Sequence, residues 1–397
     1  MMIITILCSC NFCALASPME DLKITSPCAI LVEASTGEVI LEKNAHEPRS
    51  IASVTKIMTM TLVMEAIEEG IIKLEDIVTT SENAAKMGGS QIWLEVGEQM
   101  TVSDMLKAVA IESANDAAVA LAELISGTEE AFVSKMNEKA KMLGMNNTKF
   151  YNTNGLPGNN SEEDNVSSAY DVALMSIELL KYADIHQWLT TWIDTLRNGN
   201  NVLTNTNKLI KTYEGADGIK TGYTDRAKYC LSATAKRNNI RMISVILGAD
   251  TSDVRFSEAG RLMDYGFRNY QSNQLVAKGQ KVCDVTVFKG TIDTIELIAS
   301  DDLNIVCKKN SDESFSTKIA LPEKINAPIS AGQKLGELIV FKGGEEINKI
   351  DIVASCDIPK ISVANSILKG FKDLFTKLIS FEKNIDDLST IEDNVTN

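Results

Sequence analysis

Three short polar strings constrain this 397-residue chain more than any other feature: Ser53-Val54-Thr55-Lys56, Ser113-Ala114-Asn115 and Lys220-Thr221-Gly222. Each string is common by itself. A Ser-x-x-Lys match is expected about once per chain at average residue usage, and residues 366–369 form a second one. The order and the wide separation of the three strings are much less common. They predict a fold in which three distant segments meet at one catalytic site.

The first string can supply a nucleophile and its base. A serine hydroxyl is a poor nucleophile until a neighbouring base takes its proton. The only histidines, His46 and His186, lie in no recognisable triad setting, so a lysine with a lowered pKa is the alternative base. Ser53 and Lys56 share one face if a helix begins at Ser53. The competing interpretation is a helix-capping serine followed by a solvated lysine.

A mostly buried helix is predicted directly after Ser53. Residues 54–66 are largely apolar, and Glu69-Gly70 marks the end of the pattern. The start of a helix places backbone N–H groups beside Ser53, where they can bind an oxyanion.

The second string lies between two helical patterns, at residues 102–110 and 117–125. Ser113 and Asn115 are therefore expected at a junction between helices, where short polar side chains can relay a proton and orient a substrate amide. The alternative is an ordinary helix cap made by one of these two residues.

The third string precedes two predicted strands, at residues 229–235 and 242–247, joined by a turn at 237–239. An extended Lys-Thr-Gly segment offers a cation, a hydroxyl and backbone groups along one edge, where a peptide can dock as an added strand. Gly222 leaves room for the substrate backbone. The alternative is an ordinary lysine on a surface strand.

Together the strings resemble those of serine-type D-alanyl-D-alanine carboxypeptidases, which are low-molecular-mass penicillin-binding proteins. The resemblance covers roughly residues 22–380. Residues 87–94 are most similar to the sporulation-associated branch of Gram-positive bacteria. The other stretches that carry the resemblance are 51–59, 132–143 and 154–156.

The resemblance implies a role for each string. Ser53 would be the acylated nucleophile and Lys56 its base. Ser113 and Asn115 would assist proton transfer and orient the substrate.

The third string would hold the substrate. Lys220 and Thr221, with Arg255, would bind its terminal carboxylate along the strand that contains Gly222. The backbone N–H groups of Ser53 and Tyr223 would form the oxyanion hole.

Two positions depart from the family's pattern. Ala114 stands where the family usually has glycine, which adds only a methyl group. Lys228 of Ala227-Lys228 stands where the family often has glycine. This lysine is expected to place a long cation near the rim of the site and to influence substrate choice.

The resemblance also predicts the fold. We expect an α/β catalytic domain at residues 21–270, with an antiparallel sheet built from its N- and C-terminal parts and helices on both sides. A small all-β domain should follow at 275–360. Its short strands are expected at residues 282–288, 292–299, 304–308, 314–321, 338–341 and 350–354.

Both ends of the chain carry further signals. Residues 1–16 predict an export signal, with a cleavage site at Ala14-Leu15-Ala16, although no basic residue precedes Lys23; a buried first strand is the alternative. Residues 363–381 place their apolar side chains on one helical face. In the family such a helix anchors the enzyme on the outer face of the cytoplasmic membrane. Packing on protein is the alternative, and 382–397 form an acidic tail.

Composition limits the partners. Lys and Arg number 39 against 54 Asp and Glu, a formal charge of −15, so nucleic-acid binding is not expected. With only two histidines, we predict no metal site and no cofactor. After the signal, five cysteines remain, and we expect buried free thiols. They are Cys28, Cys230, Cys283, Cys307 and Cys356.

The sequence therefore predicts an exported carboxypeptidase that removes the terminal D-Ala from peptidoglycan stem peptides and is acylated by β-lactam antibiotics. A serine β-lactamase shares the three strings, but such enzymes use a glutamate to activate water, and the acidic run 162–164 lacks the usual surroundings. A penicillin-binding sensor or scaffold without turnover is the other alternative.

Overall fold

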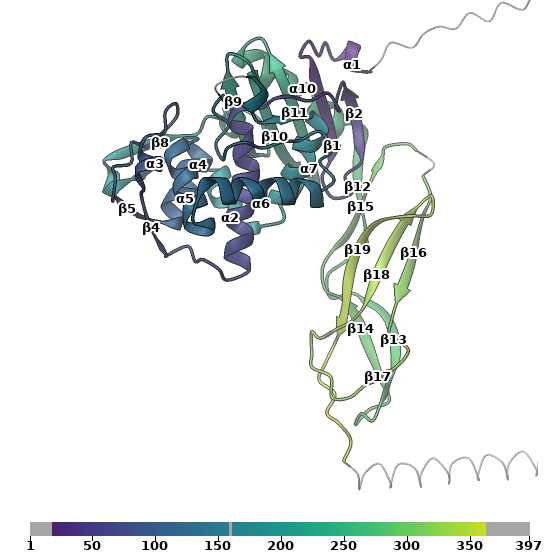
Figure 1. The fold of residues 1–397 in the computed structure, drawn as a ribbon. Coiled ribbons are helices and arrows are strands. Elements are labelled where there is room, and N and C mark those ends of the chain that lie inside the picture. The colour runs from purple at the N-terminus through teal and green to yellow at the C-terminus, as the bar shows by residue number, and fades with distance from the viewer. Residues whose placement is uncertain (1–17, 159–160, 312, 363–397) are drawn as a thin grey trace, which may run out of the picture. The chain divides into compact units, whose positions relative to one another are not determined.

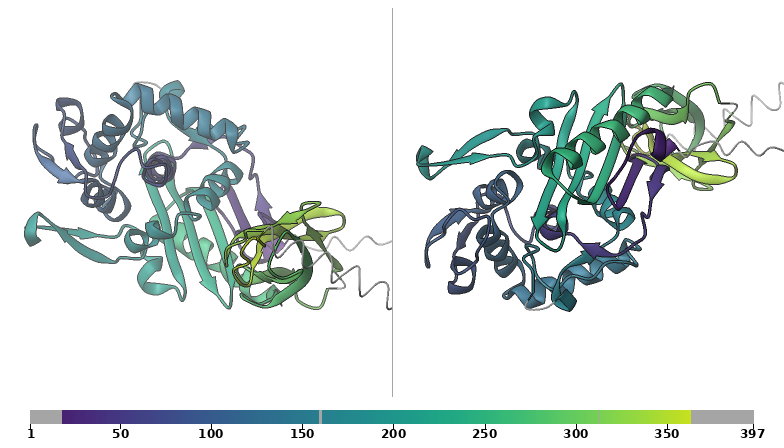
Figure 2. Two further views of the ribbon diagram at one scale, coloured as in Figure 1. Left: turned by 90° about the horizontal axis from the view of Figure 1, so that it is seen from below. Right: turned by 90° about the horizontal axis from the view of Figure 1, so that it is seen from above.

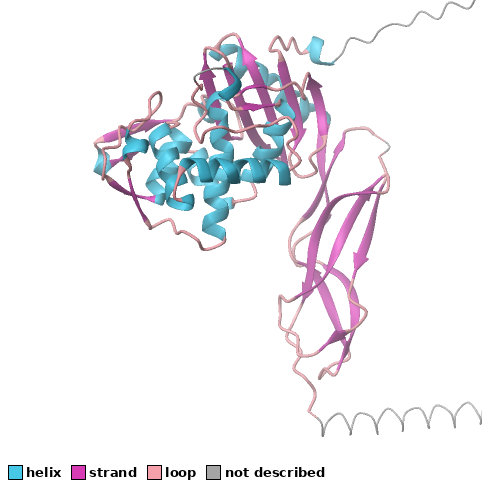
Figure 3. Cartoon of the chain, viewed as in Figure 1, coloured by secondary structure: helices cyan, strands magenta, loops and turns pink. Residues whose placement is uncertain are grey.

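The computed structural model describes residues 18–158, 161–311 and 313–362. The chain divides into two compact units, one ending at Ser272 and the other beginning at Asn273. The first unit mixes helices and strands, whereas the described part of the second contains strands and loops (Figure 3).

A five-stranded antiparallel sheet forms the centre of the first unit, in the order β2-β1-β11-β10-β9. It joins the N-terminal part of the unit to its C-terminal part, as predicted (Figure 1). Asn238 and Asn239 form the predicted turn between β10 and β11, with φ of 50° and 61°, as two-residue hairpins require. The strands are β1 (Cys28–Glu33), β2 (Val39–Lys43), β9 (Ala216–Thr224), β10 (Lys228–Arg237) and β11 (Ile240–Ala249).

Helices cover both faces of this sheet (Figure 2). On β11, Met242 and Val245 are three residues apart and therefore point to opposite faces. Gly266 of α10 (Ser252–Asn269) packs closely on Met242. Ser232, which is paired with Val245, contacts α7 (Ala169–Leu179) through its hydroxyl. The prediction of a sheet between two helical layers is confirmed.

Helix α2 (Lys56–Glu68) is buried on nearly all sides, as an almost wholly apolar helix must be. A 3-10 turn, η1 (Ala52–Thr55), precedes it, and Gly70 follows its end with φ 72°. The helix predicted after Ser53 is therefore confirmed.

Helices α4, α5, α6 and α7 of the first unit pack against α2. At the start of α4, α6, α7 and α10, a threonine or serine side-chain oxygen accepts a hydrogen bond from one free backbone N–H. These caps stabilise the helix starts. Besides η1, α2, α7 and α10, the first unit contains the helices α1 (Pro18–Asp21), α3 (Glu82–Ala85), α4 (Val102–Ile111), α5 (Asn115–Ser126), α6 (Glu129–Met142), α8 (His186–Leu189), α9 (Leu209–Thr212), η2 (Ser161–Glu163), η3 (Ala183–Ile185) and η4 (Arg197–Gly199). The paired strands are β3 (Arg49–Ser50) with β6 (Val166–Ser167), β4 (Ile77–Thr79) with β5 (Gln99–Thr101), and β7 (Ile193–Leu196) with β8 (Asn201–Thr204).

The second unit is all-β in its described part, as predicted. Six strands form a sheet in the order β16-β18-β19-β14-β13-β17, and β12 pairs with β15. The sequence missed β12 and the two-residue β17. The strands are β12 (Tyr270–Val276), β13 (Lys281–Phe288), β14 (Thr294–Ala299), β15 (Leu303–Lys308), β16 (Phe315–Ala320), β17 (Ile325–Asn326), β18 (Lys334–Lys342) and β19 (Glu345–Ala354).

Three predicted segments lie outside the described residues: the export signal at 1–16, the amphipathic helix at 363–381 and the acidic tail. Within the described residues, no helix has both the length and the apolar character that a membrane span requires. The five cysteines are free. Cys28, Cys230 and Cys307 are buried and Cys283 is half-buried, but Cys356 is exposed, so the expectation of a buried thiol is wrong for Cys356.

Candidate active site

Ser53 lies half-buried in the 3-10 turn at the start of α2. The turn is strained at Ala52, whose φ is 46°. Its backbone is also tightly packed. A side chain at Gly222 of β9 would place Cβ 2.6 Å from the Ile51 carbonyl oxygen and 3.1 Å from the Ser53 nitrogen. Gly222 is therefore needed by the chain's own backbone. The sequence predicted the substrate backbone as the close neighbour of Gly222, whereas the structure places the backbone of Ile51 and Ser53 there.

Lys56 is the best-placed base for Ser53. Its Nζ lies 3.0 Å from Ser53 Oγ and donates to Asn115 Oδ1 at 2.6 Å and to the Asn154 carbonyl oxygen at 2.7 Å. The side chain is completely buried. Burial, reinforced by the positive charge of Lys220, holds the pKa of Lys56 well below its ordinary value, against a smaller opposing effect of Asp116. The alternative of a solvated lysine is wrong.

The second string occupies the predicted junction between α4 and α5. Ser113 is nearly buried and has φ 67°. Residue Ala114 occupies the cap position of α5 and supplies no side-chain cap, so the alternative of an ordinary cap made by Ser113 or Asn115 is wrong. Asn115 instead donates from Nδ2 to the Gly88 carbonyl oxygen at 2.6 Å while its Oδ1 accepts from Lys56. This orients the amide toward the base.

The third string lies on β9, at the edge of the central sheet. Lys220 is buried, and burial together with the charge of Arg255 lowers its pKa to about 7. The alternative of a surface lysine is therefore wrong. Its Nζ lies 3.2 Å from the Thr221 carbonyl oxygen. The hydroxyl of Thr221 donates to Thr206 Oγ1 at 2.7 Å.

Arg255 reaches the same strand from α10. Its Nη1 donates to the carbonyl oxygens of Gly222 at 3.0 Å and Cys230 at 3.2 Å, so the guanidinium joins α10 to β9 and β10. Burial lowers its pKa to about 10. In the structure Arg255 is therefore committed to backbone carbonyls next to the third string.

Tyr223 continues β9 toward the hairpin. Its ring is 49% exposed, packs on Tyr229 at a centroid distance of 4.4 Å and donates its hydroxyl to Asp225. Lys228, at the other side of the hairpin, is exposed and has φ 57°. This is a conformation that glycine adopts easily and lysine does not.

Sequence reasoning missed two groups that hold the site together. The backbone carbonyl of Asn154 accepts a hydrogen bond from Lys56, and no side-chain motif predicts this contact. The buried carboxylate of Asp116 accepts the N–H groups of Ile92 at 3.1 Å and Leu94 at 3.0 Å. Its position directly after Asn115 was the only available signal.

The site combines a serine with a buried lysine whose pKa is lowered. A polar junction and a cationic edge strand surround this pair. These features define the class of serine acyl-enzymes. Residues 15–251 match the family model described as D-alanyl-D-alanine carboxypeptidase. Residues 270–360 match the model of the C-terminal domain of penicillin-binding protein 5. The chain therefore belongs to the D-alanyl-D-alanine carboxypeptidase family.

Curated relatives and solved structures agree. The chain is 48% identical over 336 residues to the D-alanyl-D-alanine carboxypeptidase DacF of Bacillus subtilis, covering 84% of this chain and 85% of DacF. A solved peptidoglycan synthesis regulatory factor, PBP3 of Streptococcus pneumoniae, is 32% identical with a TM-score of 0.72, covering 84% of this chain and 99% of that one. Penicillin-binding protein 5 of Haemophilus influenzae is 29% identical with a TM-score of 0.64, covering 85% and 98%. The predicted family, fold class and enzyme class are confirmed.

Proposed function

We propose that this chain removes the terminal D-alanine from peptidoglycan stem peptides through an acyl-enzyme on Ser53. The observation that carries the proposal is the 3.0 Å contact between Lys56 Nζ and Ser53 Oγ, made by a lysine whose burial favours the neutral amine. A neutral amine accepts the serine proton as the hydroxyl attacks. The family match favours this function over the β-lactamase alternative.

Lys56 takes the hydroxyl proton while Ser53 Oγ bonds to the carbonyl carbon of the penultimate D-alanine. The backbone N–H groups of Ser53 and Tyr223 bind the oxyanion. The C–N bond then breaks, the proton passes to the leaving amine with help from Ser113, and D-alanine departs. Water then attacks the ester carbonyl carbon and gives a proton to Lys56. The bond between this carbon and Ser53 Oγ breaks, Lys56 returns the proton to Oγ, and the shortened peptide leaves.

Recognition of the terminal carboxylate falls to Lys220 and Thr221. The pKa of Lys220 is about 7, so its amine can change protonation state near neutral pH. An arriving carboxylate would favour the charged form. Arg255 supplies a second positive charge behind β9, although its Nη1 donates to backbone carbonyls. Charge-assisted bonds to a free carboxylate then distinguish the chain terminus from an internal peptide bond.

β-Lactam antibiotics would acylate the same serine, because they present a strained amide and a carboxylate in place of the peptide. In the acidic run at 162–164, Asp164 is buried and its Oδ1 accepts from Arg226 at 2.7 Å, whereas Glu162 and Glu163 are exposed. None of the three is a buried carboxylate free to act as the second base of a β-lactamase. The acyl-enzyme formed from a penicillin is therefore expected to be long-lived.

The direct test is incubation of the full chain with diacyl-Lys-D-Ala-D-Ala and measurement of released D-alanine. Release by the wild type and none by Ser53→Ala is expected. A peptide with an amidated C-terminus should be turned over far more slowly, since it lacks the carboxylate. Penicillin binding without any D-alanine release would identify a sensor or scaffold instead. Equal turnover of acid and amide would favour an endopeptidase.

We also propose assignments for the two ends of the chain, for the domain limits and for the biological role. Export through residues 1–16, the domain limits 21–270 and 275–360, a sporulation role, and membrane attachment through 363–381 rest on sequence patterns. The helix pattern combines a broad apolar face with lysines in an otherwise acidic chain, which suits an interfacial helix. A chain ending at Lys360 should leave the vesicle pellet but keep its activity on small peptides. If it still sediments with vesicles, the anchor lies elsewhere.

A further inference from the structure

Trp93 is a large aromatic residue held in an unfavourable conformation close to the catalytic site. Its φ is 60° and its side chain is 74% exposed. A bulky residue with positive φ is a genuine outlier, and such outliers cluster at binding sites. An exposed tryptophan gains nothing from burial that would offset this strain. The position therefore indicates a ligand that the indole contacts.

The backbone on both sides of Trp93 is fixed. The buried carboxylate of Asp116 accepts the N–H groups of Ile92 and Leu94. From the β7–β8 hairpin, Arg197 donates to the carbonyl oxygens of Ile92 at 2.8 Å and Trp93 at 3.3 Å. The indole is therefore presented to solvent by a rigid segment.

A cleft of about 650 Å³ lies between the two-stranded sheets β4–β5 and β7–β8. Its volume falls within the range of about 300–1,000 Å³ that is usual for small-molecule sites. Arg197 lines this cleft and also binds the Trp93 carbonyl, so the two features share one side chain. Hydroxyl and amide groups line much of the rest, including Gln99, Thr101, Thr195 and Asn198.

The charged groups of the cleft are already paired. Glu98 accepts from Arg197 at 2.8 Å, and Asp104 lies 3.5 Å from Lys107. The cleft therefore offers hydrogen bonds and little net charge. This suits a neutral ligand rich in hydroxyl and amide groups better than an anion or a cation.

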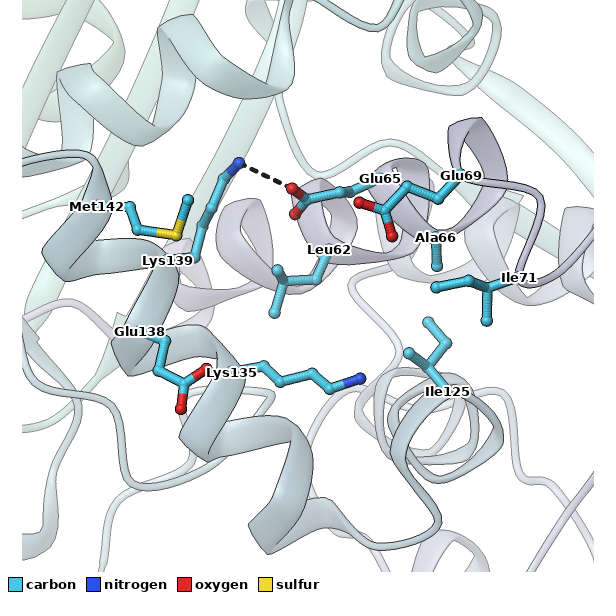
Figure 4. A pocket seen from close by; sticks show the side chains of 10 residues that line it. All are labelled: Leu62, Glu65, Ala66, Glu69, Ile71, Ile125, Lys135, Glu138, Lys139 and Met142. Carbon is cyan, nitrogen blue, oxygen red and sulfur yellow. Dashed lines mark hydrogen bonds and ion pairs between the residues drawn. The ribbon is translucent and has the colours of Figure 1, made fainter.

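A second cavity, of about 250 Å³, differs from the cleft in volume and lining (Figure 4). It lies between α2, α5 and α6, its floor is aliphatic, and no aromatic ring lines it. Figure 4 shows Lys135 and Glu138 at its edge, and Lys139 paired with Glu65 at 3.1 Å. Met142, which is also highly exposed, lines this cavity and provides a matched control.

We propose that Trp93 and the neighbouring cleft bind the glycan strand to which the stem peptide is attached. One face of a pyranose ring carries C–H groups, which are attracted to the negative face of an indole. The hydroxyl and acetamido groups of the sugars would bond to the polar lining of the cleft. The proposal deepens the proposed function and rests on it for the choice of ligand.

The spacing between the two sites suits such a substrate. The Ser90 carbonyl oxygen accepts from the backbone N–H of Asn115 at 2.7 Å, and Trp93 follows Ser90 by three residues. The Cα atoms of Ser90 and Trp93 are therefore at most about 11 Å apart. Extended peptide spans about 3.4 Å per residue, so a few residues of stem peptide cover this distance.

The binding test uses a tetramer of β-1,4-linked N-acetylglucosamine as the probe, titrated into the full chain by calorimetry. The wild type, Trp93→Tyr and Met142→Ala should bind it, and Trp93→Ala should bind it about fivefold to tenfold more weakly, the loss that corresponds to one aromatic stacking contact. Equal affinity in the Trp93→Ala variant, or no binding to the wild type up to the solubility limit, would overturn the proposal.

The kinetic test compares one pentapeptide with and without its disaccharide. The ratio of the two kcat/KM values should favour the disaccharide form in the wild type and in Met142→Ala, and should fall about fivefold to tenfold in Trp93→Ala. If Trp93 only stabilised the loop next to Asn115, both substrates would slow equally and the ratio would persist, which would overturn the proposal. If neither peptide is turned over by the wild type, the proposed function fails, while the calorimetric result still decides the glycan site.

Discussion

Two lysines at the candidate site of the first unit and two lysines of the second unit have opposite surroundings. In the first unit, Lys56 and Lys220 are buried, and the acceptors bound by their amines are uncharged oxygens. In the second, Lys281 and Lys334 are about half exposed, and each pairs with two carboxylates. Burial without a counter-charge lowers a lysine pKa, whereas exposed pairing raises it. The comparison locates the chemistry in the first unit and shows which physical difference makes a lysine reactive.

Removing the reactive lysine should produce the largest effect. Lys56→Ala should lower the rate of D-alanine release about 10²–10⁴-fold, the usual contribution of a general base. Lys334→Ala, which deletes an exposed paired lysine, should leave the rate unchanged. Circular dichroism of both variants controls for folding. Wild-type rates in Lys56→Ala would show that burial of this lysine serves stability alone.

The second lysine should matter for binding. Lys220→Met should lower kcat/KM for a peptide with a free C-terminus about 10-fold to 100-fold, because a charge-assisted bond of about 1.5–3 kcal/mol is lost. For the matching amidated peptide the change should be small. Steady-state kinetics on the two peptides measures the difference. A parallel loss on both substrates would mean that Lys220 supports the fold or the proton transfer and does not bind the carboxylate.

The sequence predicted the helix and strands that carry these lysines, but not the tertiary contacts that their side chains make. The apolar run after Ser53 correctly predicted a buried helix, and the Asn238-Asn239 turn follows from local residue preferences. The burial of Lys220 was not predicted, because a strand pattern does not show what packs on its polar residues. The contact of Lys56 with the Asn154 carbonyl and the packing of Gly222 on Ile51 both involve backbone atoms from distant segments. Neither has a local sequence signature.

The stability of the units should respond differently to pH. The pKa values of Lys56 and Lys220 are lower in the folded state than the ordinary 10.5. Between pH 7 and 8.5 the unfolded chain therefore binds more protons, and the first unit should become more stable as pH rises. The pKa values of Lys281 and Lys334 are raised. Their contribution is fully present below about pH 10, so the second unit should not change in that window.

Calorimetric scans of the full chain at several pH values between 7 and 8.5 can follow this difference, because the two units should unfold in distinguishable transitions. The transition assigned to the first unit should move to higher temperature in the wild type and move less in Lys220→Met. A first-unit transition that stays fixed or falls with pH would contradict the lowered pKa values.

The smallest effect should come from the rim of the site. Lys228 holds φ 57° in the β9–β10 hairpin, and a left-handed conformation costs a non-glycine residue about 1–2 kcal/mol. Lys228→Gly should therefore stabilise the first unit, by an amount reduced to about 1 kcal/mol or less by the extra freedom of glycine when unfolded. Lys228→Ala, which keeps the Cβ atom, should not stabilise it. Chemical denaturation distinguishes the two variants. Equal stability of both would show that the backbone at this position is not strained.

The central claim is that burial lowers the pKa of Lys56 enough for its neutral amine to take the proton of Ser53. The rate at which a penicillin acylates the full chain, followed by intact mass between pH 5 and 11 with the adduct mapped by peptide digestion, tests it directly. We predict an adduct on Ser53 and a rate that has already reached its plateau well below pH 10. A rate that keeps rising to about pH 10.5, the value of an ordinary lysine, or an adduct on another residue, would contradict the account.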